Sequence, residues 1–153
     1  MPNDSDAGTE TTKLAVEASH AERRGNVQQA LDLLERAISI AERNGIPPFF
    51  LKYKRQRMLN RSHPDVSKLL SIIEDEVAFY REHGEIRPQI DALLHLATSF
   101  AAFNKPVEAL QSLSELEVLI DSLSSIELEN LSKRRIAFCR DEITRLRKIL
   151  RTS

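Results

Sequence analysis

Cysteine, glycine and proline are scarce in this sequence, and each shortage excludes a class of structure. Only Cys139 is a cysteine among 153 residues, so no intrachain disulfide and no cysteine-built metal site can form. A lone cysteine is typical of a reducing compartment, and we therefore expect a cytoplasmic location. The four glycines and six prolines lie mostly between long segments rich in Leu, Ala, Glu, Arg and Lys, which favour helices.

Long apolar runs and a strong net charge are also missing. No run approaches the roughly 20 residues that span a bilayer, which predicts a protein outside the membrane. The first residues, MPNDSDAGTETTK, lack the basic region and apolar core of a signal peptide, and residues 1–10 have the composition of a disordered lead. The net charge of −1 gives no overall attraction to nucleic acid or to an anionic membrane. With 41% hydrophobic and 29% charged residues, the composition is that of a soluble globular domain.

Catalytic motifs are absent as well. The sequence contains no His-Glu-x-x-His, no Gly-x-Ser-x-Gly and no glycine-rich phosphate loop. The four histidines are far apart, and His95 lies in the apolar segment ALLHLA, where a packed or groove-edge position is expected. Arg135 and Arg140 flank Cys139 and could favour a thiolate, although a small apolar packing position is the commoner role of a lone cysteine. We therefore expect a protein that is not an enzyme and uses no metal or cofactor.

The segments between the glycines and prolines predict an all-α fold. In GNVQQALDLLERAISIAERNG (25–45), apolar residues recur every three or four positions, which places them on one helical face. Gly45 can adopt the left-handed conformation that closes a helix, and Pro47–Pro48 prevent continuation. No segment alternates with period two. The predicted helices span residues 11–24, 26–44, 47–61, 64–83, 86–103, 105–123 and 125–150.

Two short motifs predict where helices begin. In SHPD (62–65), Ser62 or His63 is the expected cap, with Pro64 in the first turn and Asp65 at the positive helix end. In SSIE (124–127), Ser124 and Glu127 have the spacing of a capping box.

An internal repeat organises these helices. RGNVQQAL (24–31) aligns with FNKPVEAL (103–110), which places Ala30 on Ala109, 79 residues apart, or two units of about 40. The third unit has the spacing of a tetratricopeptide repeat at Leu93, Leu96-Ala97, Phe100, Ala109 and Leu113. Residues 11–123 therefore resemble the tetratricopeptide repeat family. The resemblance implies about three antiparallel helix pairs whose first helices line a concave binding surface.

The resemblance is uneven along the chain. The middle unit fits poorly, because Arg57 occupies a position where the family has a small residue. Family members that clamp the C-terminal carboxylate of chaperones use Lys, Asn and Arg at set positions, and this chain has other residues there. These are Ala15, Ser19, Asp91 and His95. The resemblance therefore does not extend to that co-chaperone role.

The final helix has two interpretations. An array of helix pairs needs a cover for its last apolar face, and this helix supplies apolar residues at suitable spacing. The residues from Ile136 onward also have heptad-like spacing, which would suit outward dimerisation or linkage to another domain. They are Ile136, Cys139, Ile143, Leu146 and Leu150. The predicted organisation is a disordered lead (1–10), a repeat region (11–124) and a capping or linker helix (125–153).

Charge is distributed unevenly over the helices. Helix 47–61 carries five cations and no acid, and Phe50, Lys54, Arg57 and Arg61 share one of its faces. That face is either a solvated surface or part of the concave groove. Between Lys105 and Lys133 the chain is acidic, whereas the last helix is basic, so these two segments are expected to pair with each other.

These observations predict a protein–protein interaction module that binds a protein or peptide segment, acidic in character, in the concave face of a helical repeat. The candidate contact residues are Ser19, Arg23, Lys54, Arg57, Arg61, Thr98 and Ala102. One alternative is a sensory or linker domain of a signalling protein that forms a homodimer through its last helix. Another, less favoured, is nucleic-acid binding through the basic helix 47–61 and its aromatic residues.

Overall fold

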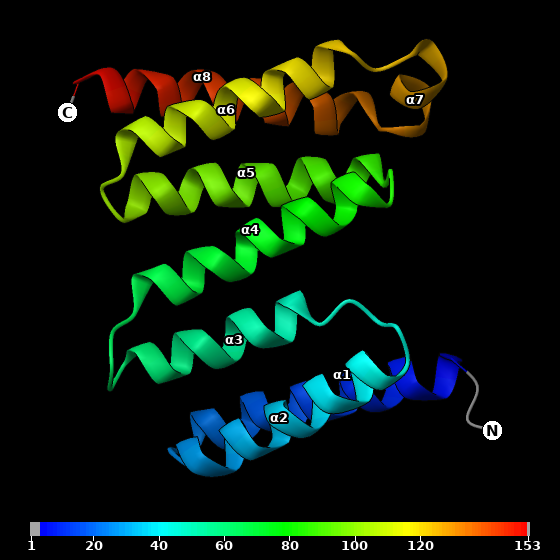
Figure 1. Cartoon of the computed structure of the whole chain (residues 1–153), viewed down its shortest axis with the longest axis vertical. Helices are drawn as coiled ribbons and strands as arrows, with labels where there is room; N and C mark the ends of the chain where they lie inside the picture. Colours follow the sequence, from blue (N-terminus) through cyan, green and yellow to red (C-terminus); the bar gives the residue numbers. More distant parts are fainter. Residues whose placement is uncertain (1–3, 153) are drawn as a thin grey trace. The chain divides into compact units, whose positions relative to one another are not determined.

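A computed structural model describes residues 4–152 of the chain and the side chains of residues 6–151. This part of the chain is all α-helical, which confirms the predicted fold class (Figure 1). The helices are α1 (Asp4–Arg23), α2 (Val27–Arg43), α3 (Phe49–Asn60), α4 (Val66–Glu82), α5 (Ile86–Ala102), α6 (Pro106–Asp121), α7 (Ser125–Asn130) and α8 (Lys133–Thr152). In the described range, no helix is both long enough and apolar enough to cross a membrane.

The first helix begins earlier than the sequence pattern suggests. α1 starts at Asp4, so residues 4–10 of the predicted disordered lead are helical, while residues 1–3 lie outside the described range. Ala7 and Thr11 are buried, and the Thr11 hydroxyl donates to the carbonyl of Gly8 at 2.9 Å. Packing of these small residues therefore extends the helix in spite of the polar, acidic composition.

Four of the turns between helices have the same geometry. Gly25, Gly45, Gly84 and Asn104 all have positive φ, between 58° and 83°. After α1, the amide of Asn26 donates to Ala21 at 2.9 Å and that of Gly25 to Glu22 at 3.0 Å, the two hydrogen bonds of a Schellman motif. The predicted left-handed closure at Gly45 is therefore confirmed, and Asn104 takes the same conformation as Gly25, the residue with which it aligns.

The turn from α3 to α4 is built differently and corrects one expectation. Ser62 or His63 was the predicted cap, but α4 begins at Val66, and the carboxylate of Asp65 accepts from the amide of Lys68 at 3.1 Å. The side chain of Asn60 both accepts from the amide of Asp65 and donates to its carbonyl, each at 3.2 Å. Pro64 consequently lies before the helix, and Asp65 is the cap.

The predicted helix 125–150 is divided in two. The capping box is confirmed, because the Ser124 hydroxyl accepts from the amide of Glu127 and the Glu127 carboxylate accepts from the amide of Ser124. However, α7 ends at Asn130, and Leu131 is extended. The Ser132 hydroxyl then accepts from the amide of Arg135, which starts α8 as a separate helix.

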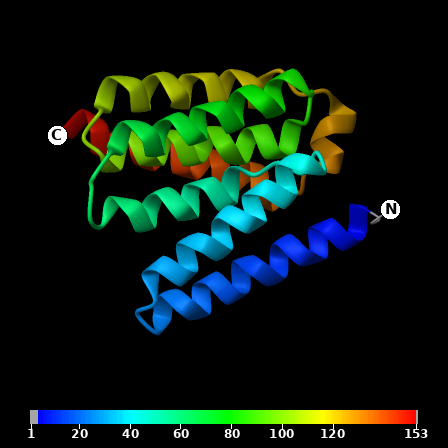
Figure 2. The ribbon, with the colours of Figure 1, turned by 60° about the horizontal axis from the view of Figure 1, so that its bottom comes forward.

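The chain forms two compact units, which divide inside α4 between Ile72 and Ile73. In the first unit, α1 and α2 lie antiparallel and α3 packs on α2 (Figures 1 and 2). Its core holds small residues where α1 and α2 meet and larger residues around them. The buried core residues include Ala18, Ala21, Ala30, Leu34, Ala37, Ala41, Leu51 and Met58.

The second unit repeats the helix pair. Here α5 and α6 lie antiparallel, and α8 packs on both of them. Ala97 and Ala109 are fully buried, as are their aligned counterparts Ala18 and Ala30 in the first unit. Small residues therefore lie at aligned positions where the paired helices touch.

Candidate functional site

An open groove between α1 and α3 is the clearest candidate site in the first unit. Its volume is 380 Å³. α1 supplies one wall, the α2–α3 turn supplies the floor and α3 supplies the other wall. The lining residues are Thr11, Thr12, Ala15, Val16, Ser19, Ile46, Pro47, Phe50, Leu51 and Lys54. We call this feature the α1–α3 groove.

The α1–α3 groove opens to solvent. A second cavity of similar size, 390 Å³, lies beside α2 and α3, but ion pairs between Lys52 and Glu42 and between Arg55 and Glu35 occupy its walls. The walls of the α1–α3 groove are mostly apolar and carry no acidic residue. It is therefore the better place for an apolar side chain of a partner.

Phe50 is the most conspicuous residue of the groove. Leu51 and Met58 are seven residues apart on α3 and anchor that helix in the core, with 7% and 3% of their surface exposed. Successive residues of a helix are turned by about 100°, so Phe50 cannot join them in the core. It is 70% exposed, and Val16 on the facing helix is 52% exposed. Two large apolar side chains are consequently available at the edge of the groove.

Lys54 places a positive charge in the same groove. Its ammonium group donates to the hydroxyl of Ser19, which in turn donates to the carbonyl of Ala15 at 3.2 Å. Lys54 and Ser19 are both half-buried. This hydrogen bond joins α3 to α1 and brings together two of the residues that the sequence analysis proposed as contacts.

Two other cations of α3, and Arg61 directly after it, pair with acids on neighbouring helices. Lys52 pairs with Glu42 at 3.2 Å, Arg55 with Glu35 at 2.9 Å and Arg61 with Glu22 at 3.2 Å. The neutralising acids therefore come from α1 and α2.

Arg57 differs from these neighbours. It is exposed and has no hydrogen bond or ion pair with any residue in the described part of the chain. Of the predicted trio Lys54, Arg57 and Arg61, only Arg57 is entirely available to a partner.

The remaining predicted contacts lie away from the groove. Arg23 is exposed at the end of α1, outside the groove lining. Thr98 and Ala102 belong to α5 in the second unit, where both are exposed and the Thr98 hydroxyl donates to the carbonyl of Leu94 at 2.8 Å. Thr12 and Val16 also line the groove and were not predicted, although their spacing places them on the same face of α1 as Ser19.

Reactive chemistry has little support in the described residues. No cluster of His, Cys, Asp and Glu there could hold a metal ion. Cys139 is 1% exposed, and burial, together with the negative charge of Asp91, raises the pKa of its thiol. The thiolate that Arg135 and Arg140 could have favoured is therefore disfavoured, and Cys139 acts as a small packing residue.

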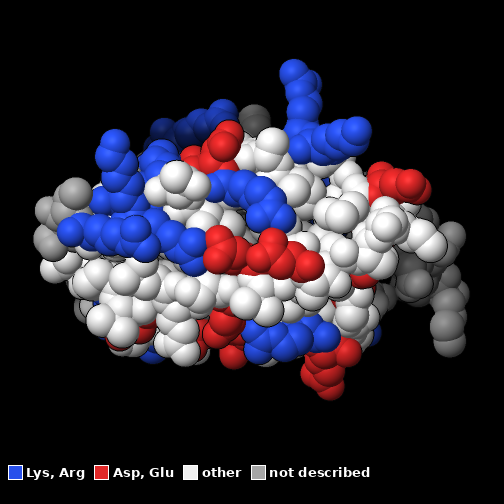
Figure 3. Space-filling view, turned by 90° about the horizontal axis from the view of Figure 1, so that it is seen from above, with Lys and Arg blue, Asp and Glu red and all other residues white. Residues whose placement is uncertain are grey.

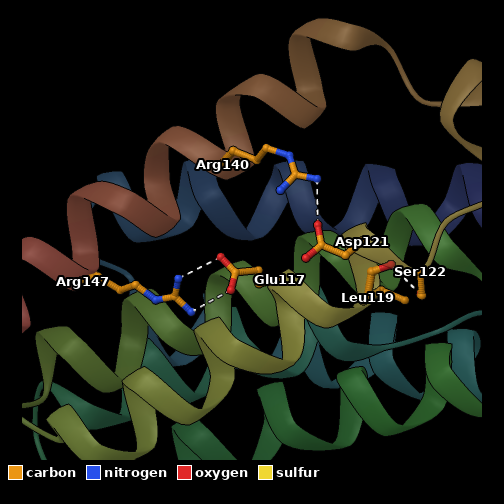
Figure 4. A network of polar contacts seen from close by, with 6 residues as sticks. All are labelled: Glu117, Leu119, Asp121, Ser122, Arg140 and Arg147. Carbon is orange, nitrogen blue, oxygen red and sulfur yellow. Dashed lines mark hydrogen bonds and ion pairs between the residues drawn. The ribbon is translucent and has the colours of Figure 1, made fainter.

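The basic helix α8 uses its charges within the second unit. Arg147 binds both carboxylate oxygens of Glu117, at 2.8 and 3.2 Å, and Arg140 binds Asp121 at 2.9 Å (Figure 4). On the face seen in Figure 3, Lys and Arg side chains accordingly lie next to Asp and Glu side chains. The expected pairing of the acidic and basic segments is therefore observed between α6 and α8.

The heptad-like residues of α8 face the same unit. Cys139, Ile143 and Leu146 are 1–4% exposed, and Ile136 and Leu150 are half-buried. A dimer formed through this stripe would have to remove α8 from α5 and α6.

Comparisons with known proteins give no further guide to the site. No family model, no curated protein and no solved structure matches the chain.

Proposed function

We propose that this chain is a non-enzymatic binding module that holds a segment of a partner protein in the α1–α3 groove. One observation carries the proposal: Phe50 is exposed at the edge of an open groove that also contains Lys54, with the unpaired Arg57 one turn further along α3. Exposed aromatic and arginine side chains are typical of the residues that dominate binding at protein interfaces.

The helical arrangement supports a tetratricopeptide-like origin of this groove. The pairs α1–α2 and α5–α6 have fully buried alanines at aligned positions and left-handed turns at Gly25 and Asn104. In that family the first helix of each pair faces the partner, and α1 and α3 are the first helices of the first two units. The proposal includes a reducing location such as the cytoplasm, which suits the single, buried cysteine.

The chemistry of the groove favours one class of partner. The apolar surfaces of Phe50 and Val16 suit an aliphatic or aromatic side chain, which would be removed from water on binding. Lys54 and Arg57 suit a carboxylate next to that side chain. We therefore infer that the partner segment has a large apolar residue flanked by Asp or Glu.

A peptide panel tests this inference. Fluorescein-labelled hexapeptides would carry a central Leu or Phe flanked by Glu, with comparison peptides in which the central residue is Ala or the flanks are Lys. Fluorescence anisotropy should show binding of the Glu-flanked Leu and Phe peptides and weaker binding of both comparison sets. Because charge accelerates encounter and is screened by salt, the association rate should fall as salt increases.

Matched variants locate the binding site. Phe50→Ala should weaken binding, whereas Phe138→Ala, which removes a 58% exposed phenylalanine from α8, should not. Arg57→Glu should weaken binding of Glu-flanked peptides, whereas Arg36→Glu on the exposed side of α2 should have little effect. Equal binding of all peptides, or equal effects of Phe50→Ala and Phe138→Ala, would contradict the proposal.

A further inference from the structure

The short helix α7 exposes apolar residues that its own unit does not cover. Ile126 is 71% exposed and Leu128 is 39% exposed, and α7 has no buried residue. Both ribbon views show α7 at the end of the helices of the second unit, where the chain turns from α6 to α8 (Figures 1 and 2). We call Ile126 and the exposed Glu129, which share one face of α7, the α7 tip.

The α7 tip carries a negative charge, whereas the α1–α3 groove contains Lys54 and no acidic residue. Glu115, Glu117 and Asp121 on α6 are paired with arginines of the same unit. Glu129, in contrast, is exposed and has no ion pair or hydrogen bond with any residue that the structure describes. It lies three residues after Ile126, so α7 presents an apolar side chain and a free carboxylate on one face.

The same complementarity holds for the units as wholes. The first unit, up to Ile72, contains eleven Lys and Arg and nine Asp and Glu, whereas the second contains eleven and fourteen. The first is therefore positive by two charges and the second negative by three. Opposite charges favour encounter between the first unit of one molecule and the second unit of another.

We propose that the α7 tip of a second copy of this chain occupies the α1–α3 groove. This rests on the proposed function, because it names a partner for the same groove. Ile126 packs against Phe50 and Val16, and Glu129, three residues later on the same face of α7, pairs with Arg57. The contact joins two different surfaces, so each bound molecule still presents a free tip or a free groove, and association is open-ended or closes into a ring.

The proposed contact between one α7 tip and one groove buries a small area. A helix of six residues covers much less than the roughly 800 Å² per partner that a standard stable interface buries. The association is therefore weak and reversible, grows with protein concentration and decreases at high salt.

Analytical ultracentrifugation of the full chain over a concentration series tests the proposal. The wild type should form larger species as its concentration increases. A groove variant, Phe50→Ser with Arg57→Glu, and a tip variant, Ile126→Ser with Glu129→Lys, should each be monomeric. An equimolar mixture of the two should form a 1:1 dimer and nothing larger, because one intact groove and one intact tip remain. Phe138→Ser should associate like the wild type.

A charge exchange provides an independent measurement on exposed residues. Arg57→Glu alone should weaken self-association about tenfold, and adding Glu129→Arg in the same chain should restore it. A monomeric wild type at all concentrations, a mixture that fails to form the dimer, or an exchange that fails to restore association would overturn the proposal. If the hexapeptides still bind in any of these cases, self-recognition fails and the proposed function stands; if no hexapeptide binds, the proposed function fails.

Discussion

Helices α3 and α8 are both basic, and both place arginines opposite acids of neighbouring helices, but they differ in how they treat their apolar residues. α8 buries a continuous stripe that includes Cys139, Ile143 and Leu146. α3 buries only Leu51, Gln56 and Met58 and leaves Phe50 at 70% exposure. Basic charge alone therefore does not show how much of a helix is used for packing.

The comparison also separates two uses of arginine. On α8, Arg140 and Arg147 hold the helix against α6 through Asp121 and Glu117. On α3, Arg55 and Arg61 have similar partners, whereas Arg57 has none among the described residues. α8 also has an exposed phenylalanine, Phe138, one turn after the exposed Arg134, so α3 is set apart by the α1–α3 groove that Phe50 lines.

The largest difference between the two helices should appear in stability. Ile143→Ala on α8 should lower the free energy of unfolding by about 2–5 kcal/mol, because it removes buried methyl groups and leaves a cavity. Phe50→Ala on α3 should change it by less than about 0.5 kcal/mol, because the ring is already in water. Urea denaturation followed by circular dichroism measures both. A similar loss for the two variants would show that Phe50 is a packing residue.

Overpacking the aligned alanines tests whether the α1–α2 and α5–α6 pairs are structurally equivalent. Ala30→Leu and Ala109→Leu should each cost about 1–3 kcal/mol, because both side chains are fully buried where paired helices touch. The same denaturation experiment measures the loss. If one variant were as stable as the wild type, the two positions would not be structurally equivalent and the repeat alignment would fail.

The ion pairs should contribute less. Glu117→Gln, which weakens the bidentate contact with Arg147, should cost about 0.2–1 kcal/mol, and Glu35→Gln, beside the more exposed Arg55, should cost no more than that. Both losses should shrink in high salt, where the charges are screened. Thermal melts at two salt concentrations measure both losses. A larger loss for Glu35→Gln than for Glu117→Gln would contradict this prediction.

The smallest effect concerns pH. Burial, and then the negative charge of Asp91, raise the pKa of Glu76 on α4. The folded state therefore binds the proton more tightly than the unfolded state, and this contribution to stability is present below the unfolded pKa and lost as the pH rises through the folded pKa. Glu76→Gln should accordingly be more stable than the wild type at pH 7, and the difference should shrink as the pH falls to about 4. A gain that persisted unchanged at low pH would contradict this origin.

Sequence patterns predicted the helices well, because apolar periodicity and glycine turns are local properties. The turn at Gly45 and the capping box at Ser124 and Glu127 were both predicted. The break at Leu131 was not, because the apolar pattern continues through it and only the extended backbone of that residue ends α7. The early start of α1 was also missed, because it depends on burial of the small residue Ala7.

The candidate site was predicted only in part. Lys54 was proposed from helical spacing and Ser19 from the family resemblance, and the structure brings them together. The acids that pair with the cations of α3 could not be identified from that helix, because Glu22, Glu35 and Glu42 come from α1 and α2. Which cation stays unpaired is decided by tertiary packing, and so Arg57 could not be separated from Arg61 in the sequence.

The most direct test of the central claim is an NMR titration of the isotope-labelled full chain with the Glu-flanked Leu hexapeptide. If the α1–α3 groove is the binding site, the amide signals of Ser19, Phe50 and Lys54 should shift together and saturate with one dissociation constant, while Phe138 and its neighbours on α8 stay in place. Shifts that are largest on α8, or no shifts at all, would contradict the assignment of α3 as the binding helix.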